Sequence, residues 1–483
     1  MPSGWYSDLR EFLECLEREG EIASVSREVD WNLEMGALSR IGLDRRAPAL
    51  WFDNIKGYRR DCSVVANLIG PTKPVIQGRI ALAMGLSRET PTLEIVDEFA
   101  RRSTQIIPPV MVDSGPCKDN IRKGEDVDLW RFPVPLVHVM DGGRFIGTWH
   151  IDITKDPDSG HVNWGMYRHE VHDRNTLGWL AIPAQHGPAL YYQKYSARNE
   201  PMPLAIAIGT EPISSVIAGT SVPATVSEPE LAGGIRGKPV ELVKCETVDL
   251  EVPASAEIVI EGFVPPHKRH DEGIYGEFTG YAAGERMPRP FMNVTCVTYR
   301  HDPILTMSNM GKPWDEFGVM SSITMSAMIG NALRAQGIPF KAVYVPAPIL
   351  AVIVSVKAPY QGFVQTLASA IWSSKAGIYR PYIFVVGEDV DVTNAEDVFW
   401  CLTTRLHPLN GIHQQHHTPM TPLWPFLSHE ERMQGWGSKV LFDATFPPNR
   451  PESDGSTIVD LRHAWPEDVQ GRTLRMWAEL GLG

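Results

Sequence analysis

Apolar residues recur with a helical period close to the start of the chain. Positions 9, 12, 13 and 16 carry Leu, Phe, Leu and Leu, which is the i, i+3, i+4, i+7 spacing of one helix face. Ser7 precedes this stripe as a candidate N-cap, and Gly20 follows it as a stop signal. The pattern therefore predicts a helix between these two residues. A strand over 63–68 and a helix over 92–102 are expected further along.

The middle of the chain has a different pattern. Short runs of apolar, β-branched and aromatic residues alternate with turns rich in glycine and proline, as is typical of strands. Several short strands at this density predict a barrel or a sandwich. The expected strands cover residues 149–154, 162–167, 204–208, 258–264 and 292–299.

Helices return after residue 315 and alternate with strands, which is typical of an α/β fold. Asn394 is expected to cap a helix, and a short helix is expected over 474–480, in a tail that begins with prolines. The overall prediction is an α/β protein, α+β when the whole chain is considered, with a β-rich centre. The other elements predicted in this part are helices over 321–335 and 363–371 and strands over 342–345, 350–356 and 382–386.

Composition limits the possible functions. The 483-residue chain has 43% hydrophobic and 21% charged residues, which is ordinary for a globular protein with a sizeable core. It carries 45 Lys and Arg against 58 Asp and Glu, a net charge of −13 that disfavours binding to nucleic acid or to an anionic membrane. The six cysteines are scattered and the N-terminus lacks the apolar segment of a signal peptide. We therefore expect reduced thiols, no membrane span and a cytoplasmic location.

Three residues of the β-rich centre offer oxygen and nitrogen donors: Asn163, His186 and Glu228. As a ligand set they suit Mn²⁺ or Mg²⁺ better than a zinc ion held by thiolates. Spacing alone leaves a simpler interpretation open, because a single histidine is more often a hydrogen-bonded residue of the core or the surface.

Two glutamates, Glu272 and Glu277, lie five residues apart in a glycine-punctuated loop that leads into a strand. Two carboxylates held close together cannot both ionise cheaply, so one of them can donate a proton near neutral pH. The simpler alternative is a solvated turn.

A third cluster consists of His413, His416 and His417. Its spacing matches no known metal-binding motif. We therefore expect these histidines at the surface or in a pocket wall.

In combination, these stretches resemble the UbiD-type decarboxylases, the family of prenylated-FMN enzymes that includes ferulic acid decarboxylase and hydroxyarylic acid decarboxylases. The resemblance covers almost the whole chain, and its motifs follow in the family's order and at similar separations. They are Asn163 and Arg168 in Asn-x-x-x-x-Arg, Gln185-His186, Ser227-Glu228, and Glu272 to Glu277 in Glu-Gly-x-x-Gly-Glu, with further matches at 252–262, 386–391, 403–405 and 437–439.

The resemblance implies a three-part architecture. An N-terminal α/β domain over 1–118 is expected, followed by a split β-barrel of the flavin-reductase type over 119–315 that binds the prenylated FMN. A C-terminal α/β domain with a tail, over 316–483, is expected to form a homodimer or a homohexamer. A flavin prenyltransferase is the expected supplier of the cofactor.

The resemblance also implies a cofactor site that holds prenylated FMN, Mn²⁺ (or Mg²⁺) and K⁺. In the family such a divalent ion neutralises the cofactor phosphate, which an acidic protein needs. The residues carried over are Asn163, His186 and Glu228 for Mn²⁺, Trp164, Ala218 and Thr220 for K⁺, and Asn163, Gly165, Met166, Tyr167, Arg168, Gln185, His186 and Glu228 for the cofactor.

The implied reaction is the reversible, non-oxidative decarboxylation of an acid through a covalent prenylated-FMN adduct. No side chain is an adequate electron sink for a vinyl or aryl carbanion, so a cofactor must carry that chemistry. Arg168 would meet the substrate carboxylate, Glu277 would protonate the carbon that lost CO₂, and Glu272 would hold both in position.

The substrate is less well defined by the sequence. Phe278, Thr421 and Leu423 fall on expected pocket positions, and the small Thr421 leaves room for a wide ring. An aromatic or heteroaromatic acid, such as a hydroxybenzoate, indole or pyrrole carboxylate, is the first expectation. An α,β-unsaturated acid is the second and a polyprenylated quinone precursor the third. Two alternatives differ in kind from an independent decarboxylase. One is a partner-dependent subunit of a larger (de)carboxylase complex, and the other is a plain FMN redox enzyme.

Overall fold

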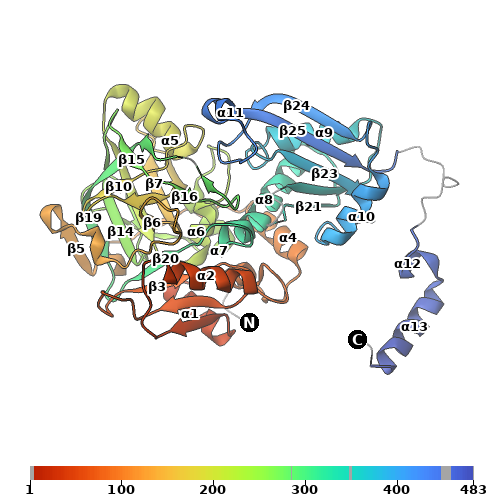
Figure 1. Cartoon of the computed structure of the whole chain (residues 1–483), viewed down its shortest axis with the longest axis horizontal. Coiled ribbons are helices and arrows are strands. Elements are labelled where there is room, and N and C mark those ends of the chain that lie inside the picture. The colour runs from red at the N-terminus through yellow and green to blue at the C-terminus, as the bar shows by residue number, and fades with distance from the viewer. Residues whose placement is uncertain (1–4, 284, 347–350, 448–457, 482–483) are drawn as a thin grey trace.

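A computed structural model describes residues 5–283, 285–346, 351–447 and 458–481 (Figure 1). The first helix is α1 (Leu9–Arg18), which buries Leu9, Phe12, Leu13 and Leu16 as the pattern predicted. The prediction of Ser7 as its cap was wrong by one residue. The Asp8 carboxylate accepts from the Glu11 amide at 2.9 Å, while the Ser7 hydroxyl bonds to the Glu11 side chain.

A four-stranded sheet forms the N-terminal part of the molecule, in the order β1-β2-β3-β20. Its last strand comes from far along the chain and lies parallel to β3, so the first and the middle parts of the chain are joined by one sheet. The strands are β1 (Ile22–Val25), β2 (Ala49–Phe52), β3 (Ser63–Ala66) and β20 (Ile304–Met307), with helices α2 (Glu34–Arg45), α3 (Gly78–Ala83) and α4 (Thr92–Arg102).

A nine-stranded antiparallel sheet occupies the centre, in the order β6-β9-β10-β19-β14-β11-β7-β8, with β5 paired to β19. Ile206 and Ile208 of β11 pack into one core while Ala205 and Ala207 pack into another, so the sheet is buried on both faces. Burial on both faces explains the nearly continuous apolar runs in the sequence. The strands are β5 (Asn120–Lys123), β6 (Arg144–Gly147), β7 (His150–Lys155), β8 (Val162–Gly165), β9 (His169–Val171), β10 (Thr176–Gly178), β11 (Met202–Ile208), β14 (Ile258–Val264) and β19 (Phe291–Tyr299).

Short elements surround the central sheet. Helices α5 (His186–Leu190) and α7 (Glu228–Arg236) both pack against β8, and α6 (Pro212–Ala218) packs against β7 and α7. Three small sheets complete this part of the molecule. They contain β4 (Val110–Met111), β12 (Glu241–Lys244) and β13 (Glu251–Pro253); β15 (His270–Glu272) and β18 (Met287–Arg289); and β16 (Tyr275–Gly276) and β17 (Ala282–Ala283).

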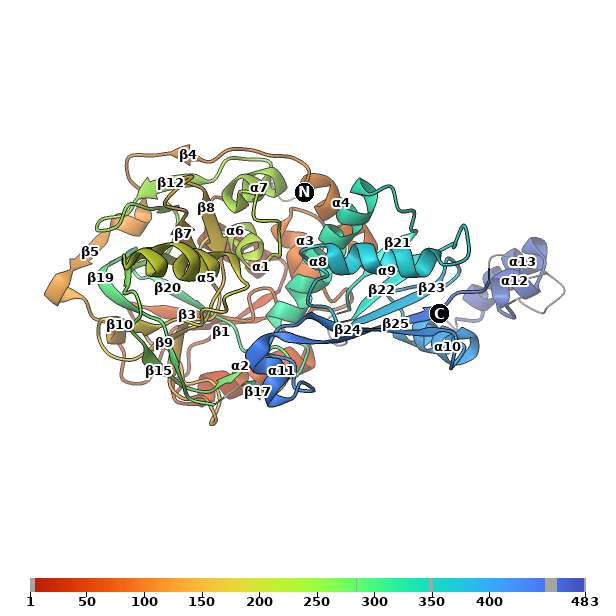
Figure 2. The same ribbon diagram turned by 90° about the horizontal axis from the view of Figure 1, so that it is seen from above.

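The long helix α8 (Glu316–Ala335) leads into the C-terminal domain, where a five-stranded sheet has the order β21-β22-β23-β25-β24 (Figure 2). Asn394 caps α10 as predicted. The expected start of strand 350–356 lies partly outside the described residues. The remaining elements are β21 (Ala342–Tyr344), β22 (Val352–Val356), β23 (Tyr382–Gly387), β24 (Ile412–Pro419), β25 (Trp436–Ala444), α9 (Phe363–Ser373), α10 (Ala395–Arg405) and α11 (His429–Gln434).

The observed order, α/β then all-β then α/β, confirms the predicted fold class. The histidine cluster lies on β24, where His416 and His417 are exposed, so it is a surface feature as expected. All six cysteines have free thiols. No helix within the described residues is long and apolar enough to cross a membrane.

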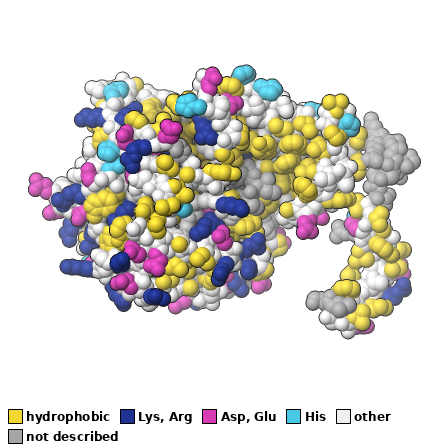
Figure 3. Space-filling view, viewed as in Figure 1, with side chains coloured by type: hydrophobic (Ala, Val, Ile, Leu, Met, Phe, Trp, Pro, Cys, Tyr) yellow, Lys and Arg dark blue, Asp and Glu magenta, His cyan; other side chains and the backbone are white. Residues whose placement is uncertain are grey.

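The tail extends away from the rest of the molecule in Figures 1 and 2. It contains α12 (Leu461–Ala464) and α13 (Glu467–Glu479), the latter longer than the short helix predicted. Figure 3 shows hydrophobic side chains on the surface of this tail and of the adjacent C-terminal domain. Exposed members of the tail are Trp465, Leu474, Met476 and Trp477.

Candidate active site

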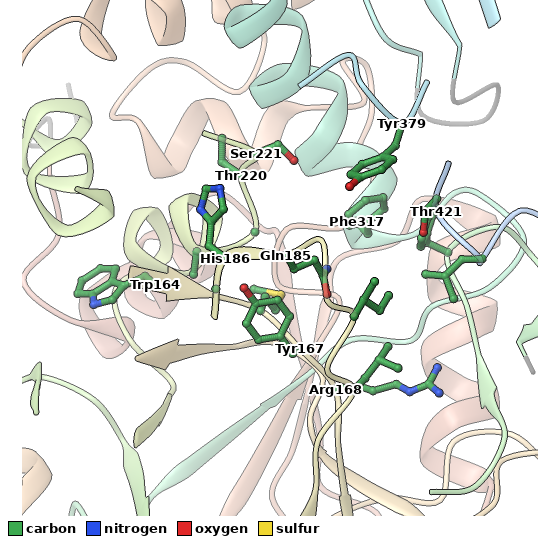
Figure 4. Close-up of a pocket in the computed structure, with 18 of the residues that line it drawn as sticks. Trp164, Tyr167, Arg168, Gln185, His186, Thr220, Ser221, Phe317, Tyr379 and Thr421 are labelled. Carbon is green, nitrogen blue, oxygen red and sulfur yellow. The ribbon is translucent and has the colours of Figure 1, made fainter. Parts of the chain in front are cut away.

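The candidate site is a cavity of about 1430 Å³, counting its open mouth, between the central sheet and the C-terminal domain. In Figure 4, His186 and Thr220 lie on one side of the pocket, Tyr379, Phe317 and Thr421 lie on the other, and Tyr167 and Gln185 lie between them. The cavity brings together every site residue predicted from the sequence except Glu272. Those residues are Asn163, Trp164, Gly165, Met166, Tyr167, Arg168, Gln185, His186, Ala218, Thr220, Glu228, Glu277, Phe278, Thr421 and Leu423.

Glu272 lies behind the cavity wall and is joined to it through Arg168. The Arg168 guanidinium donates to both oxygens of Glu272, from Nε at 3.1 Å and from Nη2 at 3.0 Å, and its Nη1 donates to Glu277. The ring of Tyr275 packs 5.1 Å from the guanidinium carbon. One arginine therefore holds both carboxylates that the sequence placed five residues apart.

The charges of this triad are unequal, because one guanidinium faces two carboxylates. Burial raises the pKa of Glu277 above its usual value, Arg168 opposes that rise, and the charge of Glu272 adds to it. Burial lowers the pKa of Arg168, but the two carboxylates outweigh it and raise the value overall. The arrangement favours a permanently charged arginine next to a glutamic acid that can carry a proton.

A buried hydrogen-bond network holds the segment that precedes Glu277. The Gly276 amide donates to Asp141 at 3.0 Å, and Asp141 also faces Nδ1 of His138 at 3.1 Å. Nε2 of His138 faces the side-chain oxygen of Asn309 at 3.0 Å, and that oxygen is an acceptor because the Asn309 amide nitrogen donates to a backbone carbonyl. Both ring nitrogens therefore face acceptors, which is the pattern of a protonated histidine.

A second buried cluster holds the strand end that presents Arg168. The Tyr167 amide donates to Asp152 at 3.2 Å, and the Tyr167 carbonyl lies 3.0 Å from Nε2 of His150. His169 lies 2.7 Å from the same aspartate. Because both the amide and the carbonyl of Tyr167 contact this cluster, it fixes the backbone position from which Arg168 projects.

The three candidate divalent-metal ligands come from elements that pack together. Asn163 lies on β8, and His186 and Glu228 are the first residues of the two helices that contact this strand. Burial raises the pKa of Glu228 to about 7, although the Trp164 amide donates to it at 3.1 Å. Burial lowers the pKa of His186 to about 4, so the imidazole is neutral near pH 7, as a metal ligand must be.

Other features of the cavity fit an anionic flavin. The side-chain oxygen of Gln185 is buried and has no hydrogen-bond partner among the described residues. Lys375 lines the cavity, and burial lowers its pKa. An unpartnered acceptor, a cation and an oxygen–nitrogen ligand set in one cavity suit a cofactor with polar ring edges and a phosphate.

The opposite wall is aromatic. Phe278 packs against Phe317 with ring centroids 4.5 Å apart and against Trp424 at 6.4 Å. Thr421 and Leu423 lie beside them along the cavity. This wall can bind the faces and edges of a planar ring.

Sequence reasoning missed several residues of the cavity, among them Phe317, Lys375, Tyr379 and Arg380. Phe317 belongs to the first turn of α8, which begins five residues before the predicted start. The other three lie in the loop between α9 and β23, where no periodic pattern marks single residues. The only available signal was the pair of basic residues close to the tyrosine in a chain of net charge −13.

Comparison with known families identifies the family to which the chain belongs. Residues 13–101, 110–313 and 318–444 match the N-terminal, Rift-related and C-terminal domains of 3-octaprenyl-4-hydroxybenzoate carboxy-lyase, UbiD. The chain belongs to the UbiD family of carboxy-lyases. It is 32% identical over 489 aligned residues to pyrrole-2-carboxylic acid decarboxylase of Pseudomonas aeruginosa, covering 99% of this chain and 98% of that protein.

Solved structures agree. The chain is similar to vanillic acid decarboxylase of Sedimentibacter hydroxybenzoicus in its closed form, with a TM-score of 0.88, 31% identity, and 98% and 99% of the two chains covered. The TM-score with the open form of that enzyme is 0.83. A UbiD-class enzyme of Pelotomaculum thermopropionicum in complex with FMN gives 0.80 at 30% identity, over 94% of this chain and 97% of the other.

Proposed function

We propose that this carboxy-lyase decarboxylates an aromatic or heteroaromatic acid with the help of prenylated FMN. The observation that carries the proposal is the buried ion-paired triad of Arg168, Glu272 and Glu277 at the wall of a cavity that also holds the oxygen–nitrogen ligand set. Relatives named for pyrrole-2-carboxylate and vanillate support an aromatic substrate.

The cofactor residues are assigned as follows. Asn163, His186 and Glu228 would hold Mn²⁺ or Mg²⁺ against the cofactor phosphate, and Trp164, Ala218 and Thr220 would hold K⁺. The backbone of 165–167 and the side chain of Gln185 would contact the flavin. The bound cofactor would supply the electron sink that no side chain can offer. Metal analysis of the purified protein tests the ligand set: Glu228→Gln should lose the divalent ion and the flavin, and retention of both would contradict the assignment.

The chain's own residues would perform the remaining work. Arg168 would orient the substrate carboxylate through its planar donors. Glu277 would donate its carboxyl proton to the carbon that has lost CO₂, and in the reverse direction the ionised Glu277 would remove that proton. Glu272 would keep Arg168 in place, and Phe278, Thr421 and Leu423 would position the ring.

The proposal also covers the roles of the three domains, the location of the protein and its assembly. We assign residues 1–118, 119–315 and 316–483 to the N-terminal, cofactor-binding and oligomerisation domains. A cytoplasmic homodimer or homohexamer, loaded by a flavin prenyltransferase, is proposed as the working form. The structure of an evolved dimeric form of the Pelotomaculum thermopropionicum enzyme in complex with prenylated FMN supports a homo-oligomer for this class.

A CO₂-release assay tests the function. Protein co-expressed with a flavin prenyltransferase is incubated with pyrrole-2-carboxylate, indole-3-carboxylate, vanillate, 4-hydroxybenzoate and cinnamate. We expect CO₂ release from at least one of the ring acids. Protein expressed without the prenyltransferase should release none. CO₂ release from cinnamate alone would show that the substrate is an α,β-unsaturated acid instead of an aromatic one. If flavin-loaded protein released no CO₂ from any of these acids, the proposal would be contradicted.

A further inference from the structure

Arg380 is a buried cation on the C-terminal wall of the cavity. It follows Tyr379 in the loop between α9 and β23, lines the cavity, and is only 5% exposed. Its Nη2 points at the sulfur of Met325, which is a weak acceptor. No acidic side chain in the part of the chain that the structure describes forms an ion pair with it.

Two other buried arginines show that this situation is unusual in the molecule. Arg79 pairs with Glu21 at 3.0 Å, and Arg236 lies 3.6 Å from Glu211. A buried charge without a partner destabilises a fold, because its lost hydration is not replaced. Burial lowers the pKa of Arg380 to about 10, which leaves it charged at neutral pH.

The loop that carries Arg380 is held rigidly. Four consecutive carbonyl oxygens, those of residues 378–381, each accept a hydrogen bond, from Lys439 Nζ, Trp424 Nε1, Trp372 Nε1 and the Val440 amide respectively. The distances are 2.6, 3.2, 2.9 and 2.8 Å. The backbone from which the Arg380 side chain projects is therefore fixed before a ligand binds, so little backbone freedom would be lost on binding.

The position of Arg380 favours the substrate over the cofactor phosphate as its partner. Its Nη2 points at Met325 of α8, the helix that also carries Phe317 of the aromatic wall. Its neighbour Tyr379 lies on the side of Phe317 and Thr421 in Figure 4. Arg168 belongs to the barrel wall of the same cavity.

Resting on the proposed decarboxylase function, we propose that Arg380 binds a second anionic oxygen group of the substrate, a carboxylate or a phenolate, while Arg168 faces the carboxylate that leaves. The substrate would then be a planar aromatic acid with two acidic groups. A monocarboxylate without the second group would leave the guanidinium unpaired.

Calorimetric binding to the cofactor-loaded full chain tests this without turnover. Terephthalate and benzoate form a matched pair that differs by one carboxylate. We expect terephthalate to bind the unmodified protein about 10- to 100-fold more tightly, the range of a charge-assisted hydrogen bond. Arg380→Gln should abolish this preference while changing the affinity for benzoate little, Arg380→Lys should keep part of it, and Arg334→Gln, on the exposed face of α8, should keep all of it.

The outcomes separate the two proposals. Equal binding of both acids by the unmodified protein, or equal weakening of both in Arg380→Gln, would overturn the role of Arg380. Loss of flavin absorbance in Arg380→Gln would assign the cation to the cofactor phosphate and would also overturn it. Preferential binding of terephthalate without CO₂ release from any acid tested would uphold the anion subsite while contradicting the proposed function.

Discussion

The Arg168 guanidinium bonds to two carboxylates that differ in what they can do. Glu272 receives two parallel hydrogen bonds and lies behind the cavity wall, while Glu277 lines the cavity and is only 4% exposed. A carboxyl group in such surroundings binds a proton more readily than one in water, because burial disfavours the charge. The residue that touches the cavity is therefore also the one suited to donate a proton.

Replacing the donor tests this assignment. We expect Glu277→Gln to lower kcat by about 10²- to 10⁴-fold, the usual contribution of a positioned general acid, with bound flavin unchanged. The measurement is CO₂ release by protein of equal flavin absorbance. The exposed Glu285→Gln is the control and should retain full activity. A Glu277→Gln enzyme with normal turnover would remove this glutamate from the mechanism.

The His138 network predicts how stability depends on pH. Burial lowers the pKa of His138, but hydrogen bonds with Asp141 outweigh this and raise it above 6.5. A raised folded pKa gives stability that is complete below about pH 6.5 and is lost as pH rises through the folded value. The melting temperature should therefore fall as the pH rises from about 6.5 through the folded pKa of His138.

The His138→Gln variant should lack this slope and be less stable than the unmodified protein at pH 6. Its kcat should also fall more than its substrate affinity, since Asp141 holds the amide of Gly276 next to Glu277. Exposed His429→Gln is the matched control. An unchanged slope in His138→Gln would show that another group titrates.

Individual residues of the candidate site could be predicted only where they belong to a sequence motif of the family. Arg168, Glu272 and Glu277 occur in a recognisable order, and the structure brings them together. Lys375 and Arg380 could not be found in this way, because a single basic residue in a loop carries no periodicity and its burial depends on distant chain segments. The Asp8 cap was missed because two adjacent residues, Ser7 and Asp8, are both good caps.

Among the elements, those with one dominant pattern were predicted best. Helix α4 and strand β14 have the bounds expected from their apolar residues. Helix α8 begins earlier than predicted because nearly all its faces are buried, so its first turn shows no amphipathic contrast. Strand β20 was not among the predicted strands, and its pairing with β3 joins residues about 240 positions apart, which no local pattern encodes.

The segment that carries both glutamates depends on two glycines in contact. A Cβ at Gly273 would lie 2.4 Å from the Cα of Gly142, which must then move. We expect Gly273→Ala to destabilise the protein by about 1–3 kcal/mol, as overpacking does, and to lower kcat because Glu272 and Glu277 shift. Thermal melting and CO₂ release measure the two effects. Gly471→Ala in α13, where no backbone atom is near, is the control; equal behaviour of the two variants would contradict the role of this contact.

Over the whole molecule, the apolar surface of the tail predicts self-association. Leu474 and Trp477 lie three positions apart on α13 and are 56% and 55% exposed, and contiguous exposed apolar patches mark interaction sites. Introducing Leu474→Glu together with Trp477→Glu should give a smaller assembly by analytical ultracentrifugation. Arg472→Glu, a charge change on the same helix, should leave the assembly intact. An unchanged mass in the double variant would show that the tail does not hold copies together.

Hydrogen exchange at the reacting carbon tests the central claim most directly. The arene product of the best substrate is incubated in D₂O with cofactor-loaded protein, and deuterium at the former carboxyl position is followed by NMR. If Glu277 carries the proton reversibly, the unmodified protein should introduce deuterium there, and Glu277→Gln with equal bound flavin should not. No exchange under conditions in which decarboxylation proceeds, or equal exchange by both proteins, would contradict the account.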